Sequence, residues 1–525
     1  MNRRVPRSKR PRPPKNSPPL PSVEAEPEKT PSIALVVAVV LTAILEVIDI
    51  TIVSVAMPHM LGAFGATSDQ ITWVLTSYLV AAAVVMPLTG YLSGVFGRKR
   101  LLIFAIVGFV VSSALCGLSW NLLSMVIFRI IQGICGAPLV ALSQSILLAA
   151  FPREKHGQAL AIFGMGIMVA PVLGPVLGGW LTDTFVWRAV FYINVPIGVV
   201  ALLLATGQLA TVPMTYAKTD WTGLILLVFA VGSLQLVLDQ GPTRDWFDSR
   251  FIQLCTLISV FAGAAFLLRG WGKSDNIIDL SLLKDRNFVA GLVASMAYGI
   301  PLFGTIALLP LLTQRLMGYP AMSAGLLFMP RAIVSTITLA ITGGILLRLF
   351  DPRYLVAAGI ILSAIGAIVM ARISLDVDAW GLIWPGMIAG AGMGLFFVPL
   401  NAVAFGRISD ARLDEASGLM ALVRGIGSSA GIAVVSWLLV HQAQVHWTLL
   451  IENINPFNPA LVPYLTSSPA LPQESSAKIL VLGVARQAQM QAFVDLFWFI
   501  GWVTFALLPL VFLMKRPERT DLALA

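Results

Sequence analysis

The chain has 525 residues, of which 57% are hydrophobic and only 12% are charged, and its formal net charge is +9. Soluble globular domains carry about 25% charged residues, so this composition excludes an ordinary soluble fold and indicates a membrane protein. The basic residues form no stripe with interleaved aromatic residues, and nucleic acid is therefore not an expected partner.

Residues 1–32 form a polar, basic and proline-rich segment. Such a segment cannot bury enough apolar surface to fold, and it is predicted to be a disordered tail. It is too long and polar for a simple signal peptide, and the apolar run that follows has full spanning length.

Apolar runs of spanning length fill the rest of the chain, since a helix needs about 20 apolar residues to cross the hydrocarbon core. The sequence predicts fourteen membrane-spanning helices: 33–57, 70–94, 100–119, 122–150, 157–181, 188–209, 220–239, 251–269, 289–312, 321–347, 354–373, 380–406, 416–440 and 490–514. The runs lack the period-two alternation of β-barrel strands, so an all-α integral membrane protein is expected.

Two carboxylates lie in the first span, within LEVIDITIVSVAMP at residues 45–58. Glu46 and Asp49 are three residues apart and share one helix face. A carboxylate inside a bilayer is costly and usually faces a wet cavity where it serves a function, here the binding and release of protons. The alternative is a structural role, in which the carboxylate pairs with an arginine or lies near the interface.

The fourth span contains FRIIQGICGAP, residues 128–138. Arg129 stays charged, and the carboxylates of the first span are its natural partners. A purely structural ion pair is the alternative to a role in proton coupling. Gln132 is expected to form hydrogen bonds in the substrate cavity.

The fifth span contains GMGIMVAPVLGPVLGGWL, residues 164–181. Gly174, Gly178 and Gly179 have the small-residue spacing that lets helices touch closely, and Pro175 favours a bend. Sealing and bending during a transport cycle, or ordinary packing, are both compatible with this pattern.

Two further arginines lie inside later spans, Arg331 in the tenth and Arg424 in the thirteenth. Arg331 is assigned to the substrate cavity because a buried charge needs a reason. Arg424 lies near the end of its span, where its side chain could also reach the interface.

The sequence offers no phosphate-binding loop, no Ser-His-Asp constellation and no zinc spacing. Cys116, Cys135 and Cys255 lie singly in apolar runs. No catalytic residue, metal or cofactor is therefore expected, and the chain is predicted not to be an enzyme or an ATP-driven pump.

A weak internal repeat divides the chain. GYLSGVFGRKRLL from Gly90 aligns with GILLRLFDPRYLV from Gly344, at an offset of 254. Gly157, Gly164 and Gly166 align in the same way with Gly418, Gly425 and Gly427. These matches predict two six-helix halves with a two-helix insert, and a substrate site between the halves near the membrane midplane.

The expected organisation is a cytoplasmic tail (1–32), an N-terminal half (33–210), a linker with the insert (211–287), a C-terminal half (288–517) and a second cytoplasmic tail (518–525). The C-terminal half includes a long external loop, 445–488. With both termini cytoplasmic, 25 of the 35 Lys and Arg residues lie inside and seven outside, as the positive-inside rule requires.

The motifs together resemble the major facilitator superfamily, and within it the fourteen-span drug:proton antiporters of the EmrB/QacA type, with the EmrB type more similar. The loop GYLSGVFGRKR, the span-4 and span-5 motifs, WRAVFYINVPIG from Trp187, DWFDS from Asp245 and NPFNP from Asn455 carry this resemblance. It extends from about residue 33 to about residue 517.

The resemblance implies proton coupling at Asp49, together with Glu46, and a proton- or substrate-linked role for Arg129. It identifies Gly174, Pro175, Gly178 and Gly179 as the antiporter motif. It also implies an inner-membrane location, and as partners a periplasmic adaptor protein and an outer-membrane channel, besides small organic substrates, protons and membrane lipids.

In the loop between spans 2 and 3, Gly90, Gly97 and Arg98 match the gating loop of the family. Gly94 and Val95 stand where the family has an acidic and a basic residue, so its gating salt bridge is not expected from position 94.

Multidrug efflux driven by the proton gradient is the leading functional prediction. A dedicated exporter of one metabolite, lipid or siderophore remains open. A sensor or scaffold is disfavoured, since it has no reason to keep Glu46, Asp49 and Arg129 at a cost of several kcal/mol.

Overall fold

The computed structural model describes residues 31–209, 220–271, 277–278, 280–452, 454, 458–459 and 473–514. Within these residues the secondary structure is helical, and fourteen candidate spans are long and apolar enough to cross a membrane. This confirms the predicted fourteen-span, all-α architecture. The predicted tails, 1–32 and 518–525, lie almost entirely outside the described residues.

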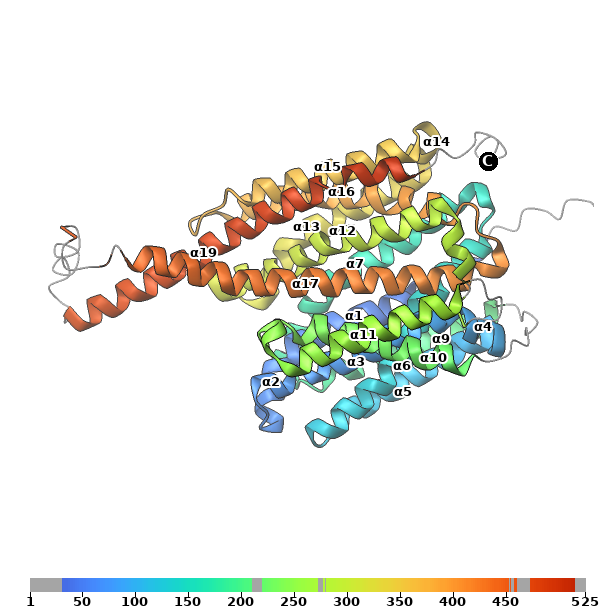
Figure 1. Cartoon of the computed structure of the whole chain (residues 1–525), viewed down its shortest axis with the longest axis horizontal. Coiled ribbons are helices and arrows are strands. Elements are labelled where there is room, and N and C mark those ends of the chain that lie inside the picture. Colours follow the sequence, from blue (N-terminus) through green and yellow to red (C-terminus); the bar gives the residue numbers. More distant parts are fainter. Residues whose placement is uncertain are drawn as a thin grey trace, which may run out of the picture.

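The N-terminal half is formed by six spans (Figure 1). Its helices are α1 (Ile33–Phe64), the broken second span α2 (Ser68–Ile71), α3 (Trp73–Val85) and α4 (Thr89–Phe96), then α5 (Arg98–Gly117), α6 (Leu122–Ala150), α7 (His156–Thr184), α8 (Ala189–Tyr192) and α9 (Asn194–Gln208).

The insert consists of α10 (Trp221–Gln240) and α11 (Arg250–Gly270). Gln240 of α10 donates a hydrogen bond to Thr76 of α3 at 3.0 Å, and Gln235 donates to Ser429 of α17 at 2.7 Å. The insert therefore contacts both halves.

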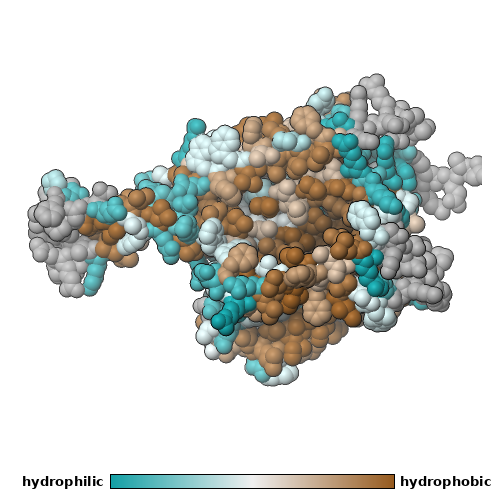
Figure 2. Space-filling view, viewed as in Figure 1, coloured by the Kyte–Doolittle hydropathy of each residue, from teal (hydrophilic) through white to brown (hydrophobic). Residues whose placement is uncertain are grey.

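The C-terminal half has six spans, built from α12 (Arg286–Pro310), α13 (Ala321–Ile341), α14 (Leu347–Leu349), α15 (Pro352–Met370), α16 (Ala379–Phe405), α17 (Leu413–Ile451) and α19 (Gln473–Phe505). Apolar side chains cover the middle of the visible face of the bundle, between more polar ends (Figure 2). On α11, for example, Phe261 is 70% exposed and Leu268 is 80% exposed, as expected for side chains that face lipid.

The repeat reappears as two equivalent contacts between the halves. A Cβ added to Gly157 of α7 would lie 3.1 Å from the carbonyl oxygen of Gly343, which follows α13. A Cβ added to Gly418 of α17 would lie 2.6 Å from the carbonyl oxygen of Met86, which follows α3. The aligned glycines thus allow the same close helix crossing on both sides of the molecule.

The last two long helices extend beyond the predicted spans. The loop expected at 445–488 is helical up to Ile451 and again from Gln473, and α17 and α19 project from the bundle as a hairpin (Figure 1). His446 and Asp495 link the two helices at 2.6 Å. Hydropathy identifies only the part of a helix that crosses the lipid. Backbone hydrogen bonds and pairing between the two helices continue α17 and α19 into water.

Candidate proton-coupling site

Asp49 lies near the middle of α1 and is completely buried. Nη1 of Arg129, from α6, lies 2.5 Å from Asp49 Oδ2, and both side chains are 0% exposed. The two residues predicted to form an ion pair are therefore brought together inside the N-terminal half. The pair replaces the water that a carboxylate and a guanidinium would otherwise need.

Two amides complete the shell around the carboxylate. Gln132 Nε2 donates to Asp49 Oδ1 at 2.9 Å, and Asn194 Nδ2 donates to the same oxygen at 2.8 Å. Asn194, at the start of α9, also donates to Ser113 Oγ of α5 at 3.0 Å. We call Asp49, Ser113, Arg129, Gln132 and Asn194 the Asp49 cluster.

Arg129 is held from several sides. Its Nε donates to the carbonyl oxygen of Val74 at 2.9 Å, and its Nη1 donates to Gln132 Oε1 at 2.8 Å. The guanidinium lies 4.2 Å from the ring centroid of Tyr78, a cation–π distance. Its Nη2 is buried without a hydrogen-bond partner among the described residues.

Every polar neighbour of the Asp49 carboxylate is a hydrogen-bond donor. The ionised carboxylate satisfies all three, since it is an acceptor only. A protonated Asp49 would carry an O–H donor that faces the donors of Arg129, Gln132 and Asn194. At least one of these contacts must therefore break or rotate when a proton binds. The cluster can therefore convert a protonation event into a movement between α1, α6 and α9.

Glu46 has different surroundings, although it shares a helix face with Asp49. Its side chain is only 2% exposed and has no hydrogen bond to a described residue. Arg424 of α17, in the opposite half, acts on it electrostatically without a direct ion pair, and Arg424 lies 5.6 Å from the ring centroid of Phe397. Glu46 thus belongs to the interface between the halves and not to the Asp49 cluster.

The antiporter motif packs α7 against α1 immediately after Asp49. A Cβ on Gly174 would collide with Thr51, and one on Gly178 would lie 3.1 Å from Ile52 Cγ1. Gly179 is buried, and Pro175 lies inside the continuous helix α7. The helix α1 is therefore in close contact with α7, which itself contacts α13 and α16 of the other half.

The predicted gating loop joins the two halves at one end of the bundle, which we call the 97–100 end. Gly97 has φ 80°, a conformation that favours glycine. A Cβ on Gly90 would lie 2.5 Å from Glu415 Cα. Arg98 Nε donates to Asp414 Oδ2 of α17 at 3.0 Å, and Ser93 donates to the same carboxylate.

An ion pair therefore connects the halves although position 94 is glycine. A Cβ on Gly94 would meet nothing within 4 Å. At the same end Arg153 lies 3.7 Å from Asp410, and Gln144 donates to Asn401 at 3.2 Å. These contacts join the two halves at the 97–100 end.

Arg331 and Gln132 were predicted to line one substrate cavity, and the structure separates them. Gln132 belongs to the Asp49 cluster, whereas Arg331 lines a cavity inside the C-terminal half. The sequence interpretation also missed Asn194, Ser113 and Asp414. Asn194 lies in the motif WRAVFYINVPIG, which was used only for the family resemblance. Its amide side chain within an apolar run was the signal that could have identified it as a site residue.

Comparison with known proteins agrees with this architecture. The family model described as the Major Facilitator Superfamily matches residues 39–432. The multidrug export protein EmrB of Escherichia coli strain K12 is 36% identical over 493 residues, which cover 92% of this chain and 96% of that protein. The fatty acid resistance protein FarB of Neisseria gonorrhoeae is 35% identical over 91% of this chain and 95% of its own.

Solved structures share the fold at low sequence identity. The proton:xylose symporter XylE matches with a TM-score of 0.57 and 16% identity, covering 91% of this chain and 95% of its own. The human organic anion transporter MFSD10 matches with a TM-score of 0.55 and 15% identity, covering 90% of this chain and 99% of its own. With a family match that spans both halves and the insert, this multi-pass membrane protein belongs to the major facilitator superfamily of transporters.

Proposed function

We propose that the protein is a proton-coupled antiporter that exports hydrophobic or amphipathic organic compounds across the inner membrane, that is, a multidrug efflux pump driven by the proton gradient without a cofactor. The observation that carries the proposal is the buried Asp49–Arg129 pair with its shell of donors. The names of the EmrB relatives, multidrug export proteins, support the class of cargo.

The proposed cycle uses Asp49 as the proton-binding residue. With both termini cytoplasmic, the 97–100 end faces the cytoplasm and is closed, while Asp49 is ionised and paired with Arg129. A proton that enters from the outer side neutralises Asp49 and loosens its pair with Arg129. The resulting movement of α1 and α7 opens the 97–100 end, where the proton leaves and cargo enters.

Glu46 and Arg424 supply a second link in this scheme. The two charges attract each other electrostatically between α1 and α17, without a direct ion pair. Cargo that enters between the halves would separate the two charges, so its binding is coupled to the same helix that carries Asp49.

Everted membrane vesicles test the proposal. Asp49→Asn keeps the size of the side chain and mimics a permanently neutral residue, so it should abolish cargo-induced proton release from vesicles, measured with a pH-sensitive dye. Binding of a fluorescent cationic dye should persist. Asp376→Asn, an exposed carboxylate in the loop before α16, is the matched control and should behave as the wild type. Concentrative uptake by Asp49→Asn vesicles under an imposed proton gradient would refute the coupling role.

A dedicated exporter of one metabolite, lipid or siderophore is the second candidate. FarB, whose printed name is fatty acid resistance protein, favours a narrower amphipathic cargo. A panel of unrelated cationic, neutral and acidic compounds separates the two, because a dedicated exporter would release protons in response to one chemical class only.

We further propose that the projecting α17–α19 hairpin contacts a periplasmic adaptor, which leads to an outer-membrane channel. Its exposed apolar side chains support this, since Ile479 is 50% exposed and Leu482 is 69% exposed. Large exposed apolar residues away from lipid mark interaction surfaces. A photocrosslinker at Leu482 should capture the adaptor, whereas one at Leu349, near the 97–100 end, should not.

A further inference from the structure

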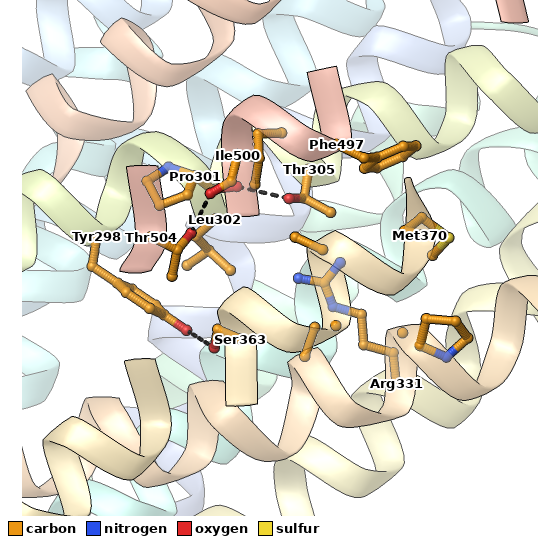
Figure 3. A pocket seen from close by; sticks show the side chains of 15 residues that line it. Tyr298, Pro301, Leu302, Thr305, Arg331, Ser363, Met370, Phe497, Ile500 and Thr504 are labelled. Carbon is orange, nitrogen blue, oxygen red and sulfur yellow. Dashed lines mark hydrogen bonds between the residues drawn. The ribbon is translucent and has the colours of Figure 1, made fainter. Parts of the chain in front are cut away.

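A partly open cavity lies in the C-terminal half, lined by residues of α12, α13, α15, α16 and α19 (Figure 3). The repeat places it where the N-terminal half has the Asp49 cluster. At the offset of 254, Arg331 of α13 corresponds to Ser77 of α3, next to Tyr78, and Gly386 of α16 corresponds to Gln132 of α6. One half thus fills this position with an ion pair, and the other half leaves it open.

Arg331 is a cation without a counter-charge among the described residues. The helices α12, α13, α15 and α16 contain no Asp or Glu, and Asp495 of α19 pairs with His446. Arg331 has no hydrogen bond or ion pair within the part of the chain that the structure describes. Its guanidinium points into the cavity (Figure 3). Because arginine stays protonated, an uncompensated guanidinium at this depth costs several kcal/mol.

The remaining lining is mostly apolar and offers few free donors. The hydroxyls of Tyr298 and Ser363 bond to each other at 2.7 Å. Those of Thr305 and Thr504 donate to carbonyl oxygens of their own helices, each at 2.7 Å. Leu302, Met370, Phe497 and Ile500 supply apolar walls.

The empty volume of about 450 Å³ includes space that is open to the surroundings of the cavity. The guanidinium is therefore the strong hydrogen-bond donor of the cavity, and most of the other lining side chains are apolar.

We infer that this cavity binds an amphiphile with one oxyanion head group, held by Arg331, and an apolar chain packed against the neighbouring walls. A free carboxylate amphiphile and an anionic phospholipid share this chemistry. The site goes beyond the proposed function, because it lies inside one half and binding to it requires neither proton flow nor transport.

Calorimetry tests the site on the full-length protein in phosphatidylcholine nanodiscs, without any gradient. Decanoate is the probe, and decanol, which has the same chain length but no charge, is its neutral control. The wild type should bind decanoate at least tenfold more tightly than Arg331→Met does. Arg348→Met removes a positive charge from the same half outside the cavity and should leave the affinity unchanged. Equal decanoate affinity in the wild type and Arg331→Met would overturn the inference.

A second variant keeps the charge and fills the space. A Cβ at Gly386 would meet only Arg331 Cβ, at 3.8 Å, so a side chain can be accommodated there. Gly386→Leu should weaken decanoate binding at least fivefold, and an unchanged affinity would place the ligand elsewhere. This variant decides the question if Arg331→Met does not fold.

Nanodiscs that contain phosphatidylglycerol distinguish the two sources. If an anionic phospholipid is the occupant, phosphatidylglycerol should compete with decanoate in the wild type, and native mass spectrometry should show a retained phosphatidylglycerol that Arg331→Met loses. If a free carboxylate is the occupant, decanoate affinity should be the same in both nanodisc types.

Discussion

Each half carries an arginine within a membrane-spanning helix, and the surroundings of Arg129 and Arg331 are opposite in kind. Arg129 is paired with Asp49 inside a shell of amides, and nothing of either side chain is exposed. Arg331 lines a cavity without an acidic neighbour on α12, α13, α15 or α16. A saturated cluster is suited to switching, because any change in its charge disturbs every partner, whereas an unsaturated cation is suited to binding.

The largest effect is expected when the saturated cluster loses its cation. Arg129→Met leaves the Asp49 carboxylate buried without a counter-charge, which should lower the free energy of unfolding by about 3–5 kcal/mol. Thermal unfolding of the purified protein in a neutral detergent measures this loss. The double variant Asp49→Asn with Arg129→Met should recover most of it, and a double variant as unstable as the single one would show that the pair is not the cause.

The amide shell should have an intermediate effect. Asn194→Leu removes donors from both Asp49 and Ser113, and we expect a loss of about 1–3 kcal/mol in the same unfolding measurement. Proton release should fall as well, because Asp49 loses part of its positioning. Thr206→Val, at an exposed position on the same helix, serves as the control and should change neither quantity.

The closed 97–100 end should matter little for stability and more for conformation. Arg98 and Asp414 are 18% and 10% exposed, and partly exposed ion pairs contribute about 0.2–1 kcal/mol. Asp414→Asn should nevertheless increase maleimide labelling of Ser417→Cys, introduced into a background without native cysteines, since Ser417 is buried on α17 near this contact. The charge-swapped pair Arg98→Asp with Asp414→Arg should restore protection; labelling that stays high in the swap argues against the ion pair.

The smallest effect on stability should come from the second arginine. Arg331→Met removes a cation that lacks a protein partner, so the unfolding temperature should stay unchanged or rise, in contrast to Arg129→Met. The measurement is the same thermal unfolding, carried out in a neutral detergent without added anionic amphiphile. A loss comparable to that of Arg129→Met would mean that Arg331 is paired, and the contrast between the halves would fail.

Much of the architecture followed from local properties of the chain. The fourteen spans were predicted from apolar runs, and a pair between Arg129 and a carboxylate of the first span was predicted from the cost of leaving either charge alone in a bilayer. The ends of α17 and α19 were predicted poorly, since hydropathy ceases to report on a helix once it leaves the lipid.

Other features of the site had no local signal. Glu46 and Asp49 share a helix face, and spacing alone suggested one role for both. The structure assigns Asp49 to partners within its own half and Glu46 to Arg424 across the interface. The ion pair from Arg98 to Asp414 joins residues more than 300 positions apart, and the departure at Gly94 gave no reason to search for it.

The sequence by itself therefore determined that this is a polytopic helical protein with two related halves. It also determined that the intramembrane charges need partners or functions. Both conclusions follow from hydropathy and the cost of burying charge, which are properties of single segments. Only the tertiary structure decided which charges are paired. Partnership depends on how each helix is rotated and how closely it packs, and glycines such as Gly174 and Gly418 set that approach through contacts with distant helices. For this reason Arg129 and Arg331, both arginines in apolar helices, proved to be different kinds of site.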